Sequence, residues 1–155
     1  MKDWSIDKNK IQVSITFADG SRGKGEIFLA YHAGEQHGGQ KVADLLNGDK
    51  AFLPISLESG SVEFISKSQI LTVEGELVSV EDEEVFSSGL IHQKDVVVVT
   101  SGNQTIVGSL LAEVPEERSR LSDCLNLPEK FIRIKAESRY LHINKAMIKK
   151  ITARN

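Results

Sequence analysis

The segment VADLLN at residues 42–47, followed by FLPI at residues 52–55, decides the fold because it occurs twice. The second copy is LSDCLN at residues 121–126 with FIRI at residues 131–134. Asp44, Asn47 and Phe52 are each repeated as an identical residue 79 positions later. Neighbouring segments are also similar in sequence: 15–20 to 97–102, 25–30 to 108–113, and 66–70 to 144–148. Because these matches keep their order over nearly all of each half, the sequence predicts an internal duplication.

Each half has the periodicity of β-strands. Ile11, Val13 and Ile15 alternate with polar residues, and the Asp19-Gly20 pair that follows is typical of a tight hairpin turn. Strands are expected at 11–17, 25–31, 52–57, 62–64 and 70–73, and again at 96–100, 105–112, 131–136, 140–143 and 147–151. Between the second and third strands of each half, we expect Asp44 and Asp123 to cap a single helical turn.

Five short strands bury a core best when they close into a small barrel, so the sequence predicts two such barrels in tandem and very little helix. The first barrel is expected at residues 1–76, a linker at 77–93 and the second barrel at 94–155. The linker contains an acidic run at residues 81–84, which is typical of a solvated loop.

Composition excludes several classes of protein. The 155 residues include 19 Lys and Arg against 22 Asp and Glu, a net charge of −3. This charge argues against a uniformly basic protein that coats nucleic acid. A single cysteine, Cys124, excludes an intramolecular disulfide framework and is expected to be a small buried hydrophobe. We find no signal peptide and no apolar stretch of membrane-spanning length, and therefore expect a cytoplasmic protein without a membrane partner.

The order of the segments resembles the Sm-like small β-barrels of the Hfq type. The likeness rests on the strand with its Asp-Gly turn, the Gly-containing return strand, the Asp…Asn segment, and the closing segments at 66–73 and 144–151. The resemblance implies an all-β fold of two tandem five-stranded Sm-like or SH3-like barrels. It also implies RNA binding, in which Lys67 and Lys145 take the place of the family's pore lysine, while Ser68 and Ala146 stand where that family has a histidine.

A basic carboxyl-terminal segment is the second argument for RNA. Residues 130–155 contain eight basic residues and a single acid, Glu137, and Tyr140 and His142 could stack on bases. The candidate nucleic-acid contacts are Lys67, Arg133, Lys135, Arg139, Tyr140, Lys145, Lys149 and Lys150. The alternative interpretation of this segment is a solvated strand face, on which lysine stems cover apolar neighbours.

Other candidate sites are weaker. His32 and His37 lie in a Gly-rich loop that has no counterpart histidines in the second half, so we expect no metal site there. Asp44 and Asp123 occupy one repeated position, which favours a structural role over acid–base chemistry. No catalytic signature, cofactor motif or metal site is predicted.

The sequence therefore favours a non-enzymatic interaction module that binds a protein partner or itself. Edge strands left by imperfect closure are natural docking sites, because their unpaired backbone groups recruit another strand. The alternative is an RNA-binding Sm-like protein that uses the basic carboxyl-terminal face; DNA is not expected as a partner.

Overall fold

The computed structural model describes residues 8–30, 42–75, 92–112, 114–115, 117, 119–137 and 139–154. The first half contains β1 (Lys8–Phe17), β2 (Arg22–Ala30), α1 (Val42–Asn47), β3 (Phe52–Ser56), β4 (Val62–Ser66), the 3-10 turn η1 (Lys67–Gln69) and β5 (Ile70–Gly75). The second contains β6 (His92–Thr100), β7 (Thr105–Ala112), α3 (Leu121–Leu125), β8 (Phe131–Ala136), β9 (Arg139–Asn144), η3 (Lys145–Met147) and β10 (Ile148–Ala153). The prediction of an all-β protein with very little helix is confirmed.

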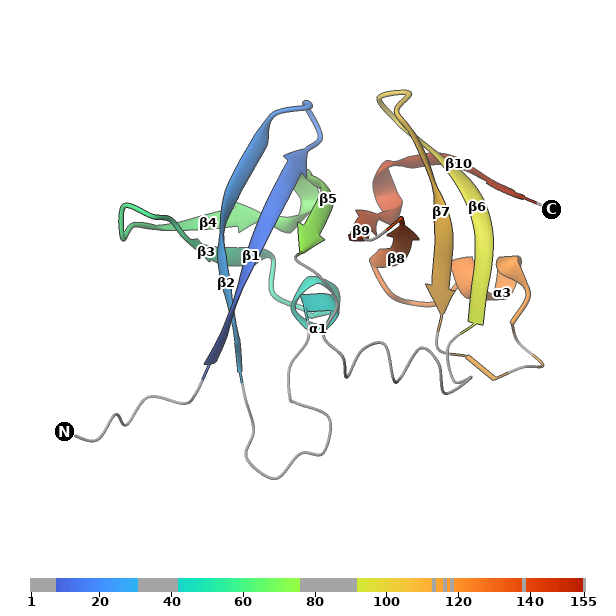
Figure 1. Cartoon of the computed structure of the whole chain (residues 1–155), viewed down its shortest axis with the longest axis horizontal. Coiled ribbons are helices and arrows are strands. Elements are labelled where there is room, and N and C mark those ends of the chain that lie inside the picture. The colour runs from blue at the N-terminus through green and yellow to red at the C-terminus, as the bar shows by residue number, and fades with distance from the viewer. Residues whose placement is uncertain are drawn as a thin grey trace.

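All ten strands belong to one antiparallel sheet, in the order β10-β6-β7-β8-β9-β5-β1-β2-β3-β4. The two closed barrels expected from the sequence are not seen, because this sheet is open. Since β5 pairs with β1 on one side and with β9 on the other, it has no edge left with which to close onto β4. Within the described residues the sheet ends at β4 and β10, which lie at opposite ends of the molecule (Figure 1).

The hairpin turn at Asp19-Gly20 forms where the sequence predicts it, and similar turns join other strands. Gly20 and Gly60 have φ of +89°, a conformation that disfavours a side chain. Asn103, in the β6–β7 turn that corresponds to the turn of Gly20, has φ of +64°. The Asp19 carboxylate accepts a hydrogen bond of 2.9 Å from the Ser21 N–H and thereby closes the first turn.

Strand alternation builds two apolar cores. Val13, Ile15 and Ile27 are buried in the first, and Val98, Ile134 and Ile143 in the second. Phe131 is the exception to this division, because it belongs to β8 of the second half but packs in the core of the first. The two halves are therefore joined by side-chain packing as well as by strand pairing.

The two short helices lie where a helical turn is expected, but the aspartates do not cap them. Asp44 and Asp123 are each the third residue of their helix, and the N-cap of α3 is Arg120, which makes no capping bond with its side chain. Asp123 instead accepts a hydrogen bond of 3.2 Å from the Arg120 guanidinium. The predicted capping is wrong because each helix begins two residues before its aspartate. No helix in the described part of the chain is long and apolar enough to cross a membrane.

Candidate functional site

The junction between β5 and β9 defines how one half of the sheet meets the other. Val73 lies opposite His142 in this antiparallel pairing, and Glu74 lies opposite Leu141. Polar contacts between described residues accompany the strand pairing. The Asn144 Nδ2 donates to the Ile70 carbonyl at 3.0 Å, the Phe131 N–H donates to the Asn47 Oδ1 at 2.8 Å, and the Arg139 Nη1 lies 3.1 Å from the Glu74 Oε1.

Two ring side chains of the second half are buried at this junction. Phe131 is 2% exposed and His142 is 7% exposed. Burial, together with the smaller effect of the neighbouring Arg133, lowers the pKa of His142 to about 4. The His142 Nδ1 has no hydrogen-bond partner among the described residues. The junction thus holds its histidine in the neutral form.

The β3–β4 hairpin of the first half matches the β8–β9 hairpin residue for residue. Phe52 pairs with Ser66 as Phe131 pairs with Asn144, and counting along the strands places Phe64 at the position of His142. In this hairpin, however, Phe52 is 55% exposed and Phe64 is 68% exposed. Positions that are buried at the junction are therefore open to solvent at the free β4 edge.

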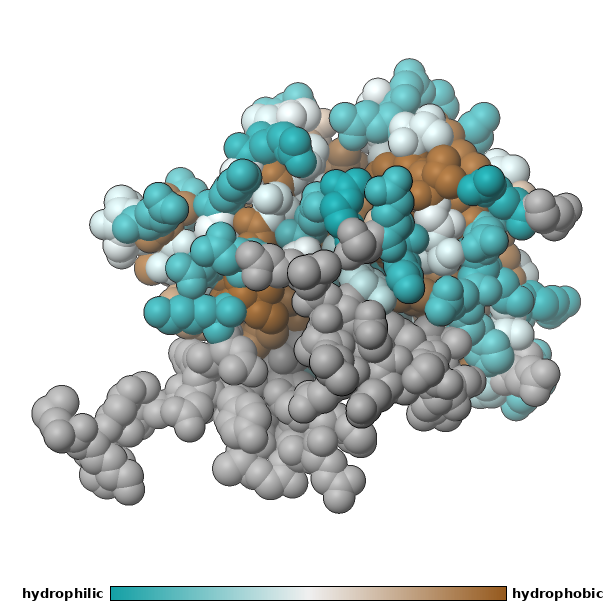
Figure 2. Space-filling model, viewed as in Figure 1, coloured by the Kyte–Doolittle hydropathy of each residue, from teal (hydrophilic) through white to brown (hydrophobic). Residues whose placement is uncertain are grey.

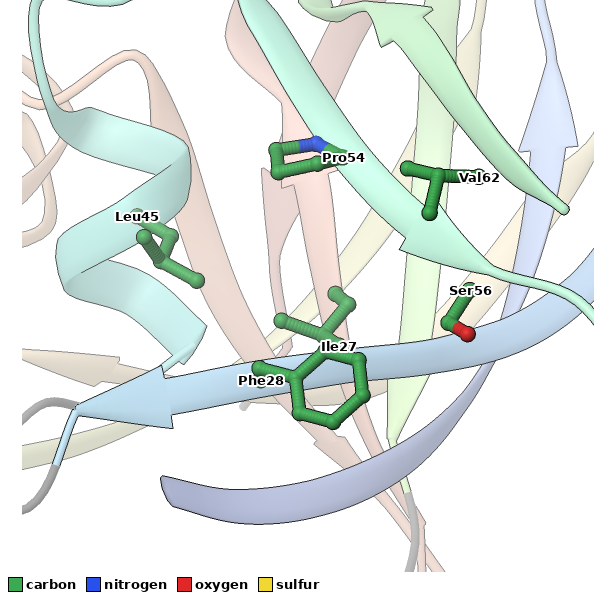
Figure 3. Close-up of a pocket in the computed structure, with 6 residues that line it drawn as sticks. All are labelled: Ile27, Phe28, Leu45, Pro54, Ser56 and Val62. Carbon is green, nitrogen blue, oxygen red and sulfur yellow. The ribbon is translucent and has the colours of Figure 1, made fainter. Parts of the chain in front are cut away.

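Further apolar side chains extend this exposed surface, which we call the β4 face and define as Phe28, Phe52, Pro54, Val62 and Phe64. Phe28 and Val62 are exposed large hydrophobic residues. They help to line a hollow of about 270 Å³ that runs from Leu45 on α1 to Val62 on β4 (Figure 3). Exposed large apolar side chains that cluster in this way are typical of protein contact sites.

The opposite end of the sheet has a different character. On β10, Lys149 and Lys150 are exposed, while Ile151 packs partly against the second core. The Lys149 ammonium donates a 3.0 Å hydrogen bond to the Asn103 side chain, which holds it toward the β6–β7 turn. Polar and apolar side chains are interspersed over both halves on the face seen in Figure 2.

Two lysines that the sequence proposes as nucleic-acid contacts are engaged inside the chain. Lys67 is buried, and its ammonium donates to the Leu45 carbonyl of α1. Burial lowers the pKa of Lys67. Lys145 makes a similar contact in the second half, donating to the Leu125 and Leu127 carbonyls at 3.1 and 2.6 Å. Both ammonium groups therefore hold the end of a short helix.

The remaining candidate nucleic-acid contacts fall into two groups. Arg133 and Lys135 on β8 lie beside Tyr140 and Arg139 on β9, and Arg139 is paired with Glu74. Lys149 and Lys150 lie on β10, and β6 and β7 separate that strand from β8. The pairing places Arg133, Lys135 and Tyr140 on one face of the sheet and Arg139 on the other, and Lys149 and Lys150 lie apart from all four.

The other sequence candidates do not assemble into a site in the described part of the chain. The His32 and His37 loop and the acidic run at 81–84 lie outside the described residues. Asp44 and Asp123 lie on helices that are well separated in Figure 1. Cys124 is buried, and its burial raises the pKa of the thiol. The described residues contain no cluster of three or more groups that could hold a metal ion.

Sequence reasoning missed the β4 face. The available signal was weak: Phe52 and Leu53 are adjacent apolar residues, so a strand through them must place one on each side of the sheet. Comparison of the chain with protein-family models, with curated proteins and with solved structures gives no match.

Proposed function

We propose that the protein is a non-enzymatic interaction module that binds a second copy of itself head to tail. In this arrangement β4 of one copy pairs with β10 of the next copy, and the β4 face is covered by the neighbour. The single observation that carries the proposal is the contrast between Phe64, which is 68% exposed, and His142, which is 7% exposed at the matching position.

The internal junction supports the choice of partner. We infer that the chain is a tandem duplication of one five-stranded unit of Sm-like type. The strand orders β5-β1-β2-β3-β4 and β10-β6-β7-β8-β9 are the same, and Lys67 and Lys145 each donate to a backbone carbonyl at the end of the short helix of their own half. The fourth strand of one unit already pairs with the fifth strand of the other. The two strands that remain at the edges are a fourth and a fifth strand.

The internal register predicts the register between copies. Val73 opposite His142 and Glu74 opposite Leu141 correspond to Ile151 opposite Phe64 and Thr152 opposite Glu63. Phe64 then meets an apolar partner. Glu63 lies on the same face as Lys150, its diagonal neighbour on β10, and an opposite-charge pair across strands is favourable.

The direction of the contact follows from the placement of the edges. Because β4 and β10 lie at opposite ends of the molecule, one copy does not satisfy both of its own edges (Figure 1). A contact between two different surfaces repeats from copy to copy, and it generates a ring where the rotation closes and a filament where it does not.

Sedimentation equilibrium over a range of concentrations tests the proposal. We expect the mass of the wild-type protein to rise above that of one chain, and Phe64→Glu to remain a single chain because it places a carboxylate at the contact. Val107→Glu is the matched control, since Val107 is an exposed apolar residue on β7, away from both edges. It is expected to associate as the wild type does.

Three results contradict the proposal. The first is a wild-type protein that is a single chain at every concentration. The second is an equal loss of association in Phe64→Glu and Val107→Glu. The third is an assembly that forms only when nucleic acid co-sediments, recognised by excess absorbance at 260 nm, which supports the alternative RNA-binding function instead.

A further inference from the structure

We propose that Asn126 is the residue that recognises the next copy, by accepting a hydrogen bond from the backbone N–H of its Phe52. This inference rests on the proposed head-to-tail association and names the polar contact that fixes its register. Asn126 follows α3 directly, and α3 lies at the far end of the molecule from β4 (Figure 1).

The internal junction contains the same contact. The Asn47 Oδ1, at the end of α1, accepts a 2.8 Å hydrogen bond from the Phe131 N–H. These residues are 84 positions apart and belong to different halves, so the bond reports directly on how the halves dock. α1 also packs against β8 across the junction. By the 79-residue repeat, Asn126 takes the place of Asn47 and Phe52 takes the place of Phe131.

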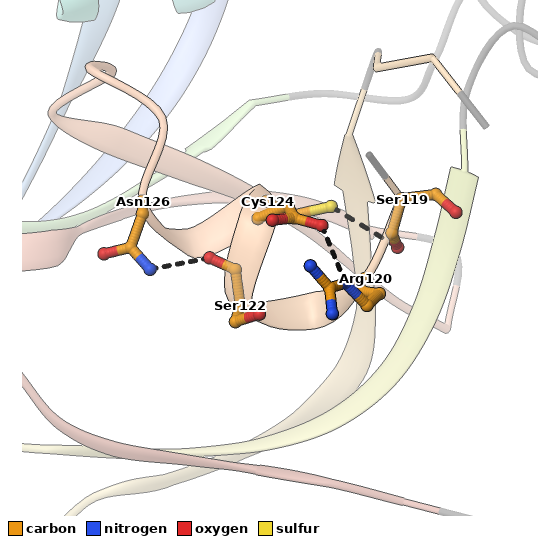
Figure 4. A network of polar contacts seen from close by, with 6 residues as sticks. Ser119, Arg120, Ser122, Cys124 and Asn126 are labelled. Atoms are coloured by element: carbon orange, nitrogen blue, oxygen red, sulfur yellow. Dashed lines mark hydrogen bonds and ion pairs between the residues drawn. The ribbon is translucent and has the colours of Figure 1, made fainter. Parts of the chain in front are cut away.

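The Asn126 side chain is already oriented for this role. Its Nδ2 donates a 2.7 Å hydrogen bond to the Ser122 carbonyl of α3, which fixes the carboxamide group. Figure 4 shows the side-chain oxygen turned away from the helix, and the residue is exposed. An acceptor held in this way loses less conformational entropy on binding than a freely rotating side chain does.

The other two polar contacts of the junction have no equivalent between copies. Asn144, which donates to the Ile70 carbonyl, corresponds to Ser66, whose shorter side chain contacts Ser68 at 3.1 Å. Arg139 and Glu74 correspond to Ser61 and Thr152, which form no ion pair. Of these three contacts, only the one made by Asn47 therefore has an equivalent between copies, and Asn126 supplies it. We expect the contact between copies to be weaker than the internal one.

Two substitutions at this position separate the hydrogen bond from other effects. Asn126→Ala removes the acceptor and is expected to weaken association about tenfold, the effect of losing one hydrogen bond at an interface. Asn126→Asp keeps an acceptor oxygen while losing the amide donor, and it is expected to associate within about twofold of the wild type. The matched control is Gln12→Ala, which removes an exposed carboxamide from the interior strand β1.

The dissociation constant between copies, measured by sedimentation equilibrium for all four proteins, decides the inference. A weakening confined to Asn126→Ala supports it. Equal affinity of Asn126→Ala and the wild type overturns it while leaving the head-to-tail association intact, as does an equal weakening of both Asn126 variants. A wild-type protein that does not associate overturns both proposals.

Discussion

The side-chain amide of Asn144 donates a 3.0 Å hydrogen bond to the backbone carbonyl of Ile70, across the line where the two halves of the sheet meet. The same side chain accepts a 3.0 Å hydrogen bond from the Ala146 N–H, which caps the turn η3. Asn144 is buried, and both the amide nitrogen and the oxygen of its side chain are hydrogen-bonded within the protein. The junction is thereby tied to the turn that leads into the edge strand β10.

Replacement of Asn144 tests the strength of this tie. We expect Asn144→Ser, which introduces the residue found at the matching position 66, to lower the free energy of unfolding by about 2 kcal/mol, because the Ile70 carbonyl is left buried without its donor. Urea unfolding measures the effect. Ser66→Ala is the control and is expected to change stability by less than about 0.5 kcal/mol. An equal effect of the two substitutions contradicts this role for Asn144.

A glycine in each half marks a close approach of two strands. A Cβ added at Gly25 would lie 2.1 Å from the Ile55 Cγ2, and one added at Gly108 would lie 2.6 Å from both the Ile134 Cγ2 and the Lys135 carbonyl oxygen. We expect Gly25→Ala and Gly108→Ala each to destabilise the protein by about 3 kcal/mol in thermal or urea unfolding. Gly75→Ala meets no atom within 4 Å and is expected to be tolerated. Tolerance of alanine at position 25 or 108 contradicts the packing described here.

These paired features show how much of the fold could be predicted from the sequence. The repeat of Asp44, Asn47 and Phe52 and the period of two around Val13 and Ile15 predict the elements and their order, because turns and alternation are local properties. The pairing of β5 with β9 could not be predicted in this way. It joins Thr72 to Ile143, and no local pattern specifies a contact over such a separation.

The candidate site illustrates a second limit. Lys67 and Lys145 are basic residues in a repeated motif, and sequence alone does not show that their ammonium groups point back at the carbonyls of their own helices. Phe64 and His142 occupy matching positions in the two halves but differ in residue type. Only the structure shows that Phe64 is exposed while His142 is buried. Exposure is a property of the fold, and composition does not contain it.

The buried His142 predicts how stability depends on pH. Its pKa falls from an ordinary value of 6.5 to about 4 in the folded chain, so the unfolded chain binds a proton that the folded chain does not between these values. The stabilisation is complete above pH 6.5 and is lost as pH falls toward 4, with a total of about 3 kcal/mol. We expect His142→Phe to flatten the dependence of unfolding free energy on pH across this window. The slopes of urea-derived free energies, compared between the two proteins, are the readout. An unchanged slope shows that His142 does not carry this dependence.

The most direct test of head-to-tail pairing is a disulfide formed between two different copies. One chain carries Glu63→Cys and the other Thr152→Cys, residues that the register places opposite each other, at the separation a disulfide bridges. The native Cys124 is buried, and unsubstituted protein serves as the control for its reactivity. After mild oxidation of the mixture, we predict disulfide-linked dimers that contain one chain of each kind, while each variant oxidised alone forms no disulfide-linked dimer. Dimers that join two Glu63→Cys chains or two Thr152→Cys chains, or no cross-link at all, contradict the pairing of β4 with β10.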